Sequence, residues 1–453
     1  MRLARLRQPM RRLALAFTLC PLFAQAPGAL PRGELVPRVV CASDARFSYA
    51  LYLPSGYRED RAWPVLYGFS PGGSGEEPVR LFQKTAERFG WIVVGSNESR
   101  NGPLRPSLEA SEAMWKDVRS RFKVDPKRSY SAGFSGGARM AMRLALKHPK
   151  NFAGLVSIGA FGTGDGMLTG LGHLRFHLSC GLEDFNHWEL QKGRQELQSR
   201  GWKALADRFE GGHRWATEAA AASALGYLQL GAGRDGLTPK DPALESEVCR
   251  ELELNAVKAG RTLLALRRWR ELAALCPDSR EGRSAREHIA ELEKESTVAE
   301  ELKLEKRYET AAAELPETPK GTQYQEVLVR HLDRLKTSPP TEQLMIRRLL
   351  GGPILSYQLA LGEAFQERSW ERLLALSTSL AALDDREGWP CVYAAISLAQ
   401  LGRPGEAIPH LKMAQVRGYR KPERLRGFDE LKPLAGREDF EAILKDMEPE
   451  RPR

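Results

Sequence analysis

The first half of the chain alternates short apolar runs with longer amphipathic stretches. The apolar runs are rich in branched and aromatic residues and end at glycine, proline or polar residues, which is typical of buried strands. These runs occupy residues 46–53, 63–69, 91–96, 129–132, 152–159, 174–180 and 203–209. Helical spacing fills the intervals, at residues 76–89, 107–122, 138–147 and 186–201 and in an alanine-rich stretch ending at Leu230. This alternation predicts an α/β domain with a mostly parallel sheet covered by helices on both faces.

The pattern changes after residues 233–242, a stretch rich in glycine and proline that is typical of a linker. Beyond it the strand pattern disappears, and leucine and alanine recur at helical spacing. The second half is therefore predicted to be all-helical. The expected organisation is an α/β domain over residues 44–232, a linker over 233–242 and a helical region over 243–448.

One part of the helical region resembles a tetratricopeptide repeat. Residues 393–402 and 406–414 form two helical stretches separated by a short turn at Arg403-Pro404-Gly405. Small residues stand where the two helices of such a repeat approach closely, at Gly402, Ala407 and Ala414. The resemblance implies a helical-repeat region, and such regions bind protein partners on extended surfaces.

The first 26 residues have the layout of a secretory signal peptide. An arginine-rich start precedes an apolar run at residues 13–23, and Ala24-Gln25-Ala26 supplies a cleavage site with small residues. The run is too short to span a bilayer comfortably. We therefore expect an exported protein, periplasmic or extracellular, with no integral membrane segment once the signal is removed.

Charge and cysteine usage narrow the functional classes. The formal net charge is +10, but five arginines lie within the first twelve residues, so 10 − 5 leaves about +5. No later basic block interleaves with aromatic residues, so a nucleic-acid partner is not expected. None of the cysteines has a metal-binding spacing, so a zinc site is not expected. No cofactor is expected either. Cys249 and Cys276 could pair in an oxidising compartment, or all the cysteines could be buried thiols.

The clearest chemical signal lies at Gly133-Phe134-Ser135-Gly136-Gly137. This G-x-S-x-G pattern stands between the apolar run at 129–132 and the helical stretch at 138–147. Strand, glycine-flanked serine and helix together are typical of a nucleophile elbow, in which a strained turn presents the serine at the end of the sheet. A glycine-rich turn without chemistry is the alternative.

A nucleophilic serine needs a base and a carboxylate that orients the base. Asp184 follows the apolar run at 174–180, and His213 follows the run at 203–209. The carboxyl ends of parallel strands meet at one edge of a sheet, so Ser135, Asp184 and His213 are expected to come together there. Glu183 and Asp165 compete with Asp184 for the role of the acid.

These residues resemble those of lid-poor esterases of the polyhydroxybutyrate-depolymerase and feruloyl-esterase type. The similarity covers residues 44–232 and includes the elbow, the G-x-x-D of residues 181–184 and the Gly-Gly-His-Arg-Trp of residues 211–215. It implies an α/β-hydrolase fold and a serine hydrolase. In that reading Ser135 is the nucleophile, His213 the general acid/base and Asp184 its orienting carboxylate.

The oxyanion hole is the point where the sequence departs from that family. One N–H donor is expected from Gly136, the residue after the nucleophile. The second normally comes from a His-Gly-Gly stretch, which here reads Ser70-Pro71-Gly72-Gly73. Pro71 has no N–H, so Gly72 or Gly73 must donate.

Residues beside the elbow and after the strand at 91–96 are expected to contact the substrate. Phe134 lies within the elbow, and Asn97, Glu98 and Asn101 follow the strand. For the three polar residues a capping or turn role is the alternative.

Taken together, the sequence predicts a secreted serine hydrolase that cleaves a small-molecule or polymer ester through an acyl-enzyme. One alternative is a catalytically inactive hydrolase domain in a protein whose helical region binds a protein partner. The other is a serine peptidase of the prolyl-oligopeptidase kind, although the chain shows no propeller-like β domain.

Overall fold

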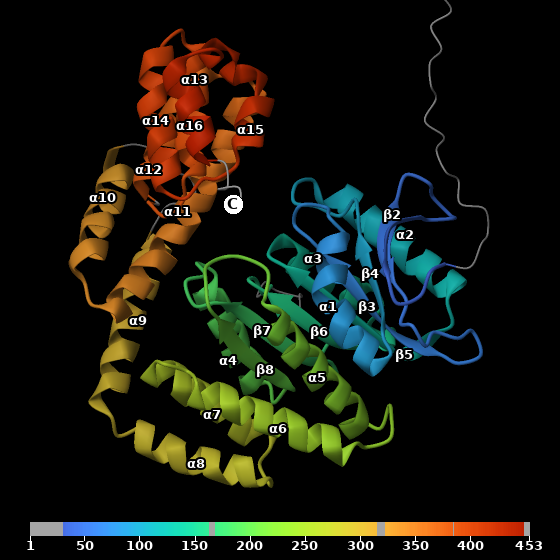
Figure 1. Ribbon diagram of the computed structural model, residues 1–453. Coiled ribbons are helices and arrows are strands. Elements are labelled where there is room, and N and C mark those ends of the chain that lie inside the picture. Colours follow the sequence, from blue (N-terminus) through green and yellow to red (C-terminus); the bar gives the residue numbers. More distant parts are fainter. Residues whose placement is uncertain (1–29, 163–167, 315–321, 384, 448–453) are drawn as a thin grey trace, which may run out of the picture. The chain divides into compact units, whose positions relative to one another are not determined.

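The computed structural model describes residues 30–162, 168–314, 322–383 and 385–447 (Figure 1). The predicted signal peptide and Asp165, one candidate for the acid, lie outside these ranges. The described helices and strands all belong to one compact unit, residues 32–453.

An eight-stranded sheet forms the centre of the first half of this unit. Its strand order is β1-β2-β4-β3-β5-β6-β7-β8. β1 and β2 are antiparallel to their neighbours, and all the other pairs are parallel. The strands are β1 Leu35–Val40, β2 Ser48–Tyr52, β3 Trp63–Phe69, β4 Ile92–Ser96, β5 Val124–Phe134, β6 Phe152–Ile158, β7 Arg175–Gly181 and β8 Ala204–Phe209. The mostly parallel sheet predicted from the apolar runs is confirmed.

Helices from the first half of the chain flank this sheet (Figure 1). They are α1 Glu76–Phe89, α2 Leu104–Arg121, α3 Gly136–Lys147, α4 His187–Ser199 and α5 Glu218–Arg234, and a short 3-10 helix, η1 Pro149–Asn151, follows α3. α1 packs against α5, and α2 packs against α3. Every residue of β3 and β7 is buried, because helices cover both faces of the parallel part of the sheet. Trp91 and Tyr130 stack within this core, with ring centroids 4.2 Å apart.

β1 was not predicted. Residues 27–43 lie outside the predicted apolar runs because Pro37 and charged residues interrupt the apolar pattern. In the structure β1 pairs with β2 at the edge of the sheet, with a register shift between Val36 and Val39. An edge strand tolerates a proline because one side of its backbone needs no hydrogen-bond partner.

The second half of the described chain is all-helical, as predicted. Its elements are α6 Pro242–Val257, α7 Thr262–Leu275, α8 Arg280–Leu292, α9 Ser296–Glu314, α10 Thr322–Thr337, α11 Pro340–Gln366, α12 Trp370–Leu383, α13 Trp389–Gln400, α14 Pro404–Val416, α15 Pro422–Gly427, the 3-10 helix η2 Asp429–Leu434 and α16 Glu438–Met447. α13 and α14 pack together, with Ala407 and Ala414 fully buried between helices and Gly402 in a left-handed turn, φ +74°. A tetratricopeptide-like repeat stays a prediction.

The first helices after residues 233–242 share a hydrophobic core with the sheet. Cys249 of α6 and Trp269 and Leu272 of α7 belong to the same buried cluster as Val156 of β6 and Leu225 of α5. The side chain of Asp241 caps α6 by accepting a hydrogen bond from the N–H of Leu244, 3.0 Å. The predicted boundary at residues 233–242 is thus a change in secondary structure across which this core continues.

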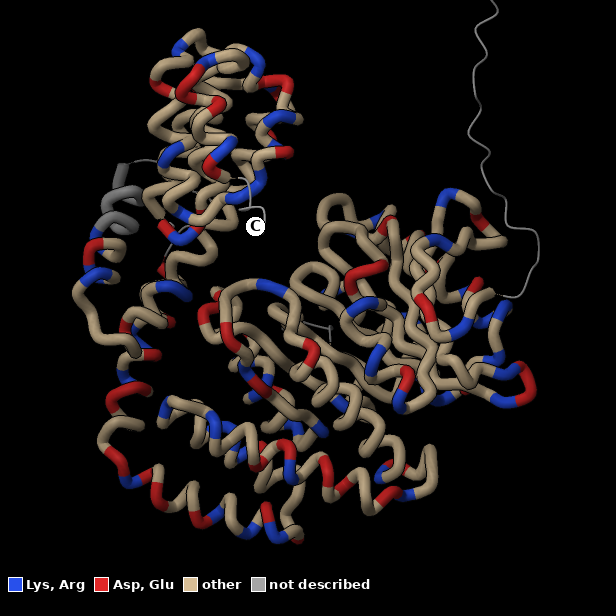
Figure 2. The backbone as a smooth tube through the Cα atoms, in the orientation of Figure 1, with Lys and Arg blue, Asp and Glu red and all other residues tan. Residues whose placement is uncertain are grey.

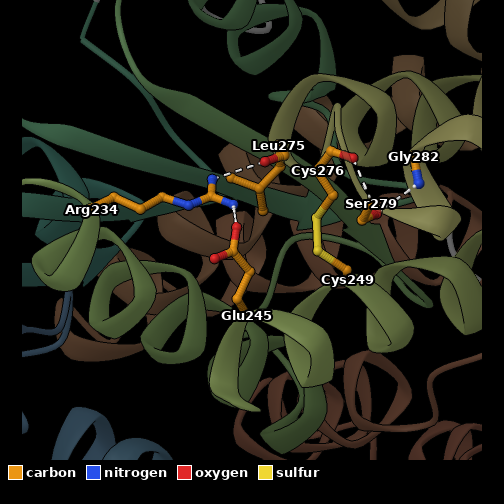
Figure 3. The surroundings of a disulfide bond; sticks show 7 residues. All are labelled: Arg234, Glu245, Cys249, Leu275, Cys276, Ser279 and Gly282. Atoms are coloured by element: carbon orange, nitrogen blue, oxygen red, sulfur yellow. Dashed lines mark hydrogen bonds and ion pairs between the residues drawn. A yellow bond between two sulfur atoms is a disulfide. The ribbon is translucent and has the colours of Figure 1, made fainter. Parts of the chain in front are cut away.

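A disulfide between Cys249 and Cys276 joins α6 to the end of α7 (Figure 3). Arg234, at the end of α5, lies beside it and donates to the carbonyl of Leu275, 2.8 Å, and to the Glu245 carboxylate. Of the two possibilities left open by the sequence, the structure contains the pairing. Within the described residues, Cys41, Cys180 and Cys391 are free and buried.

Basic and acidic residues are interspersed along the described chain without forming a long block of one sign (Figure 2). Many of them form ion pairs one helical turn apart, such as Arg80 with Glu76 and Arg105 with Glu109. None of the described helices is long and apolar enough to cross a bilayer. No group of three or more potential metal-ligating side chains occurs among the described residues.

Candidate active site

Ser135 stands on a sharp turn between β5 and α3. Its backbone angles are φ 52° and ψ −122°, a combination that residues other than glycine rarely adopt. The turn is held by the N–H of Ser135, which donates to the carbonyl of Ile158 on the neighbouring strand, 2.8 Å. The strained turn presents the serine hydroxyl beyond the end of the sheet and just before the first turn of α3.

Close packing explains why glycines surround this serine. A Cβ atom on Gly133 would lie 2.2 Å from the carbonyl oxygen of Gly137. A Cβ atom on Gly137 would lie 2.1 Å from the carbonyl oxygen of Phe69 on β3. Both distances are far below van der Waals contact, and both neighbouring atoms belong to the backbone. The outer glycines of the G-x-S-x-G pattern are therefore steric requirements of the turn.

Ser135, His213 and Asp184 form one hydrogen-bonded chain. Nε2 of His213 lies 2.9 Å from Oγ of Ser135, and Nδ1 lies 2.9 Å from Oδ1 of Asp184. Asp184 is fully buried, and its Oδ1 also accepts the N–H of Asn186, 2.8 Å. The three residues that the sequence predicted to meet are thus in contact. Their arrangement allows the imidazole to take a proton from the serine while the carboxylate holds the ring.

Parallel strands bring the three residues to one edge of the sheet. β5 leads into Ser135, the loop after β7 carries Asp184, and the loop after β8 carries His213. The last two loops are joined by backbone hydrogen bonds from Leu182 N–H to Phe209 O, 2.8 Å, and from Glu183 N–H to Gly211 O, 2.9 Å. The distance between Asp184 and His213 is therefore set by backbone pairing as well as by side chains.

Two aromatic rings enclose the imidazole of His213. The ring of Phe134 lies 4.6 Å from it and that of Phe185 lies 4.3 Å from it, measured between centroids. Phe134 also packs against Trp215, and only 8% of its surface is exposed. Phe134, predicted as a substrate contact, is therefore mainly a neighbour of the histidine. Phe185 was not predicted, and its place beside Asp184 was the only signal in the sequence.

The competing acids and the other histidines have different partners. Glu183 pairs with Arg347, 3.6 Å, and with Arg386, 2.8 Å, and not with His213. His177 is buried in β7 and has no hydrogen-bond partner in the described structure, whereas His187 bonds Glu305, 3.0 Å. Of the adjacent carboxylates at 183 and 184, only Asp184 contacts His213.

The thiol of Cys180 lies close to the acid along the chain but is an unsuitable nucleophile. It is fully buried at the end of β7. Burial raises the pKa of this thiol to about 12. A thiol with so high a pKa stays protonated at neutral pH, whereas a reactive cysteine is a thiolate.

The N–H groups expected to form the oxyanion hole have different surroundings. Gly136 is the first residue of α3, and the first N–H groups of a helix have no partner within the helix. The N–H of Gly72 donates to Oγ of Ser70, 3.2 Å, and the N–H of Gly73 donates to the carbonyl of Ser70, 3.3 Å. The Ser70 hydroxyl in turn donates to the Glu77 carboxylate. Both candidate second donors are thus engaged within their own turn.

Of the polar residues after β4, Asn97 and Glu98 bond neighbouring loops and strands, and Asn101 lies against the elbow. Asn97 accepts a hydrogen bond from Gly75 N–H, 3.1 Å, and its Nδ2 donates to Oγ of Ser48, 3.1 Å. Glu98 accepts from the N–H and the hydroxyl of Ser48. These contacts match the turn role that the sequence left open. The side chain of Asn101 lies against the elbow, since its Oδ1 is 1.7 Å from where a Cβ atom on Gly136 would stand.

Comparison with known proteins finds esterases and hydrolases over part of the chain. No family model matches. A putative esterase, NocK of Nocardia uniformis subsp. tsuyamanensis, is 41% identical over 59 residues, which is 12% of this chain and only 17% of that protein.

Solved structures align with somewhat less than half of the chain. S-formylglutathione hydrolase FrmB of Staphylococcus aureus is 15% identical with a TM-score of 0.35, and the alignment covers 43% of this chain and 98% of that one. A ferulic acid esterase is 16% identical with a TM-score of 0.34, covering 44% and 97%. Esterase B from Lactobacillus rhamnosis is 13% identical with a TM-score of 0.37, covering 47% and 91%.

Proposed function

We propose that the protein is a serine hydrolase that cleaves carboxylic esters through a covalent acyl-enzyme. The observation that carries this proposal is the unbroken hydrogen-bonded chain from Ser135 through His213 to the buried Asp184. It is strengthened by the strained backbone of Ser135, because strain of this kind persists where the surrounding structure maintains it for function. A glycine-rich turn without chemistry gives no reason for a histidine and a carboxylate to line up behind it.

In the first step, Oγ of Ser135 attacks the carbonyl carbon of the ester. Nε2 of His213 takes the hydroxyl proton as the new C–O bond forms, and the carbonyl oxygen acquires the negative charge. The N–H of Gly136 and the positive end of the α3 dipole stabilise this oxyanion. Asp184 holds the ring and stabilises the imidazolium through Nδ1.

The tetrahedral intermediate then collapses. His213 returns the proton to the oxygen of the leaving alcohol, the C–O bond to that alcohol breaks, and the acyl group stays on Ser135. Water next repeats the attack with His213 as base, releasing the carboxylic acid and restoring the serine hydroxyl. The cycle consumes one ester and one water and requires no cofactor or oxidant.

A second candidate function is a non-catalytic hydrolase domain in a protein that binds a protein partner through its helical region. The observation in its favour is that Ser70 engages the N–H groups of both Gly72 and Gly73. Those bonds are long, 3.2 and 3.3 Å, so a small rotation of the turn frees a donor. Removing one oxyanion donor typically costs about 10²–10³-fold in rate, so the catalytic proposal expects measurable turnover even before such a rotation.

The test that separates these functions uses a panel of p-nitrophenyl esters and peptide p-nitroanilides. Ester turnover by the wild type that Ser135→Ala abolishes supports the esterase. Faster turnover of the anilides would favour the serine peptidase. No turnover of either class would leave the binding protein as the better explanation.

We also infer that the protein is exported. The segment at residues 1–26 has the composition of a signal peptide. The Cys249–Cys276 disulfide supports the same inference, because disulfides persist in oxidising compartments. Alkylation in denaturant of the protein taken directly from its native host, with and without reductant, tests this: two further thiols should react after reduction. Two additional reactive thiols without reductant would contradict export.

A further inference from the structure

The loop that carries Asp184 contacts the helical region with most of its other side chains. This acid loop, residues 182–186, runs from β7 to α4. Leu182 belongs to the same buried cluster as residues of α11 to α14, and Glu183 pairs with Arg347 of α11. Phe185 packs against α11 as well. Asp184 contacts His213, so the loop lies between the catalytic base and the helices.

Arg348 of α11 holds the backbone of the acid loop. Its side chain is buried, and its Nε donates to the carbonyl of Leu182, 2.6 Å. Its Nη1 donates to Oε1 of Glu305 on α9, 2.8 Å. A charge-assisted hydrogen bond to a carbonyl two residues before Asp184 restrains the backbone that sets the direction of the carboxylate.

Glu305, the partner of Arg348, also holds the other end of the acid loop, through His187. His187 is fully buried, and its Nε2 lies 3.0 Å from Oε1 of Glu305. Its backbone N–H donates to the carbonyl of Asp184, 3.0 Å. Burial lowers the pKa of His187 well below its ordinary value, so the ring is neutral and serves as a hydrogen-bond donor. Glu305 therefore links α9 to both ends of the acid loop.

Arg348, Glu305 and His187 form a buried polar cluster in which the charges have close partners. Burial alone raises the pKa of Glu305, but hydrogen bonds from His187 and Arg267 outweigh it and hold the pKa well below its usual range. Burial lowers the pKa of Arg348 to about 10, which leaves the guanidinium charged at neutral pH. A buried charged pair is costly unless its geometry is good, and breaking it by removing one partner is strongly destabilising. The cluster is therefore specific to this arrangement of α9, α11 and the acid loop.

Phe185 lies in contact with both α11 and His213. Its ring lies 4.3 Å from the ring of His213, measured between centroids. On its other side, a Cβ atom on Gly351 of α11 would lie 3.1 Å from Cβ of Phe185. The ring therefore fits between the imidazole and a helix backbone that has no side chain at that point.

We propose that α9 and α11 position the catalytic acid and base, so that the helical region is part of the catalytic unit and not only a separate binding module. The contacts that carry this are Arg348 on the Leu182 carbonyl and Gly351 against Phe185. The inference rests on the proposed function, because it concerns the same triad. Arg348 and Phe185 are positioning residues, since each acts through Asp184 or His213.

Two adjacent glycines of α11 provide a matched test in the full-length protein. A methyl group at Gly351 meets Phe185 at 3.1–3.2 Å, whereas one at Gly352 has only Phe185 at 4.0 Å, an ordinary contact. Gly351→Ala and Gly352→Ala both replace a helical glycine by the best helix former, so their effects on helix propensity are alike. Only Gly351→Ala is expected to push Phe185 by a few tenths of an ångström toward His213.

The measurement is the turnover of p-nitrophenyl acetate per active site titrated with a fluorophosphonate, which corrects for any unfolded fraction. We expect Gly351→Ala to lower kcat about tenfold with KM within about twofold, and Gly352→Ala to stay within about twofold in both. The acidic limb of the pH–rate profile of Gly351→Ala should move to lower pH, because the imidazolium loses part of its carboxylate support. A destabilising effect alone would not move that limb.

The outcomes separate the two proposals. Equal kcat and equal pH profiles for the two variants would overturn the positioning role of α11 while leaving the esterase intact. A wild type that neither labels nor turns over esters would instead overturn the proposed function.

Discussion

Ser135 adopts a backbone conformation that a tight set of neighbours maintains. Of the described residues other than glycine, only Ser135 and Arg368 have positive φ. Arg368 follows the end of α11, where a left-handed residue commonly terminates a helix. Ser135 does not terminate a helix. Its strained conformation is maintained by the packing of Gly133 and Gly137 against backbone carbonyls.

That packing predicts the effect of a single methyl group. Gly137→Ala places a Cβ atom 2.1 Å from the carbonyl oxygen of Phe69, and a backbone atom cannot move aside cheaply. We expect a loss of about 2–4 kcal/mol in the free energy of unfolding, with loss of turnover. Gly362→Ala, in α11, is the control because nothing lies within 4 Å of its added Cβ. In urea titrations the control should be neutral or more stable by up to about 1 kcal/mol. Equal stability of the two variants would contradict the steric explanation.

Neutralising the adjacent carboxylates at 183 and 184 is expected to lower kcat to very different extents. Asp184→Asn keeps the shape of the side chain but removes the charge that supports the imidazolium, so kcat should fall about 10⁴-fold. Glu183→Gln removes ion pairs with Arg347 and Arg386 at a partly exposed position, so kcat should fall less than about tenfold. Steady-state kinetics with a p-nitrophenyl ester compares them. The reverse order would assign the acid to Glu183.

At the scale of elements, the strands of the central sheet and the helices between them were predictable from the sequence. Parallel strands buried on both faces give continuous apolar runs, as in β3 and β7, and these are the strongest local signal. β1 was missed because an edge strand needs no such run and tolerates Pro37. Its existence depends on pairing with β2, which local pattern does not encode.

The three residues of the candidate triad were predictable from the same pattern of strands. Ser135, Asp184 and His213 follow strand ends, and parallel strands bring such positions together. The surroundings of the triad were not predictable. Phe185 and Arg348 act through contacts between segments far apart in the chain, and the role of Asn97 depends on which neighbours its amide meets.

The disulfide between α6 and α7 predicts a measurable contribution to stability. It closes a loop with a sequence separation of 27 residues. In the chain-entropy treatment a loop of this length contributes about 3.5 kcal/mol by restricting the unfolded chain. Cys276→Ser should therefore lower the free energy of unfolding by about that amount. Urea denaturation of the oxidised wild type and the variant measures it. The control is the wild type kept in reductant, which should match the variant, and an unchanged variant would contradict a closed disulfide.

At the scale of the whole molecule, the helices and the sheet share both cores and charges. α6 and α7 belong to the hydrophobic cluster of the sheet, and the acid loop belongs to the polar cluster of α9 and α11. A chain built this way is expected to lose catalysis when distant helices are altered. For the same reason the change at residues 233–242, clear in the sequence, need not separate two independent functions.

Buried histidines predict how the stability of the whole protein varies with pH. Burial lowers the pKa of His177 from 6.5 to about 4, and it also lowers that of His187. Between the folded and unfolded pKa values, the unfolded chain binds more protons than the folded protein. The free energy of unfolding should therefore be highest above pH 6.5 and decrease as the pH falls, by about 2 kcal/mol at pH 5 for His177 alone.

Urea denaturation at pH 7.5 and pH 5 measures this loss. His177→Leu removes the titrating group and should reduce the difference between the two pH values by about 2 kcal/mol. A His177→Leu variant that loses as much stability on acidification as the wild type would contradict this assignment.

The central claim is that Ser135 is an activated nucleophile, and covalent labelling tests it most directly. The intact wild-type protein is incubated with a fluorophosphonate at neutral pH, and the mass of the protein and of its peptides is measured, with Ser135→Ala treated in parallel. We expect one phosphonyl group per chain, on the peptide that contains Ser135, and no labelling of the variant. An unlabelled wild type, or equal labelling of both proteins, would contradict the claim.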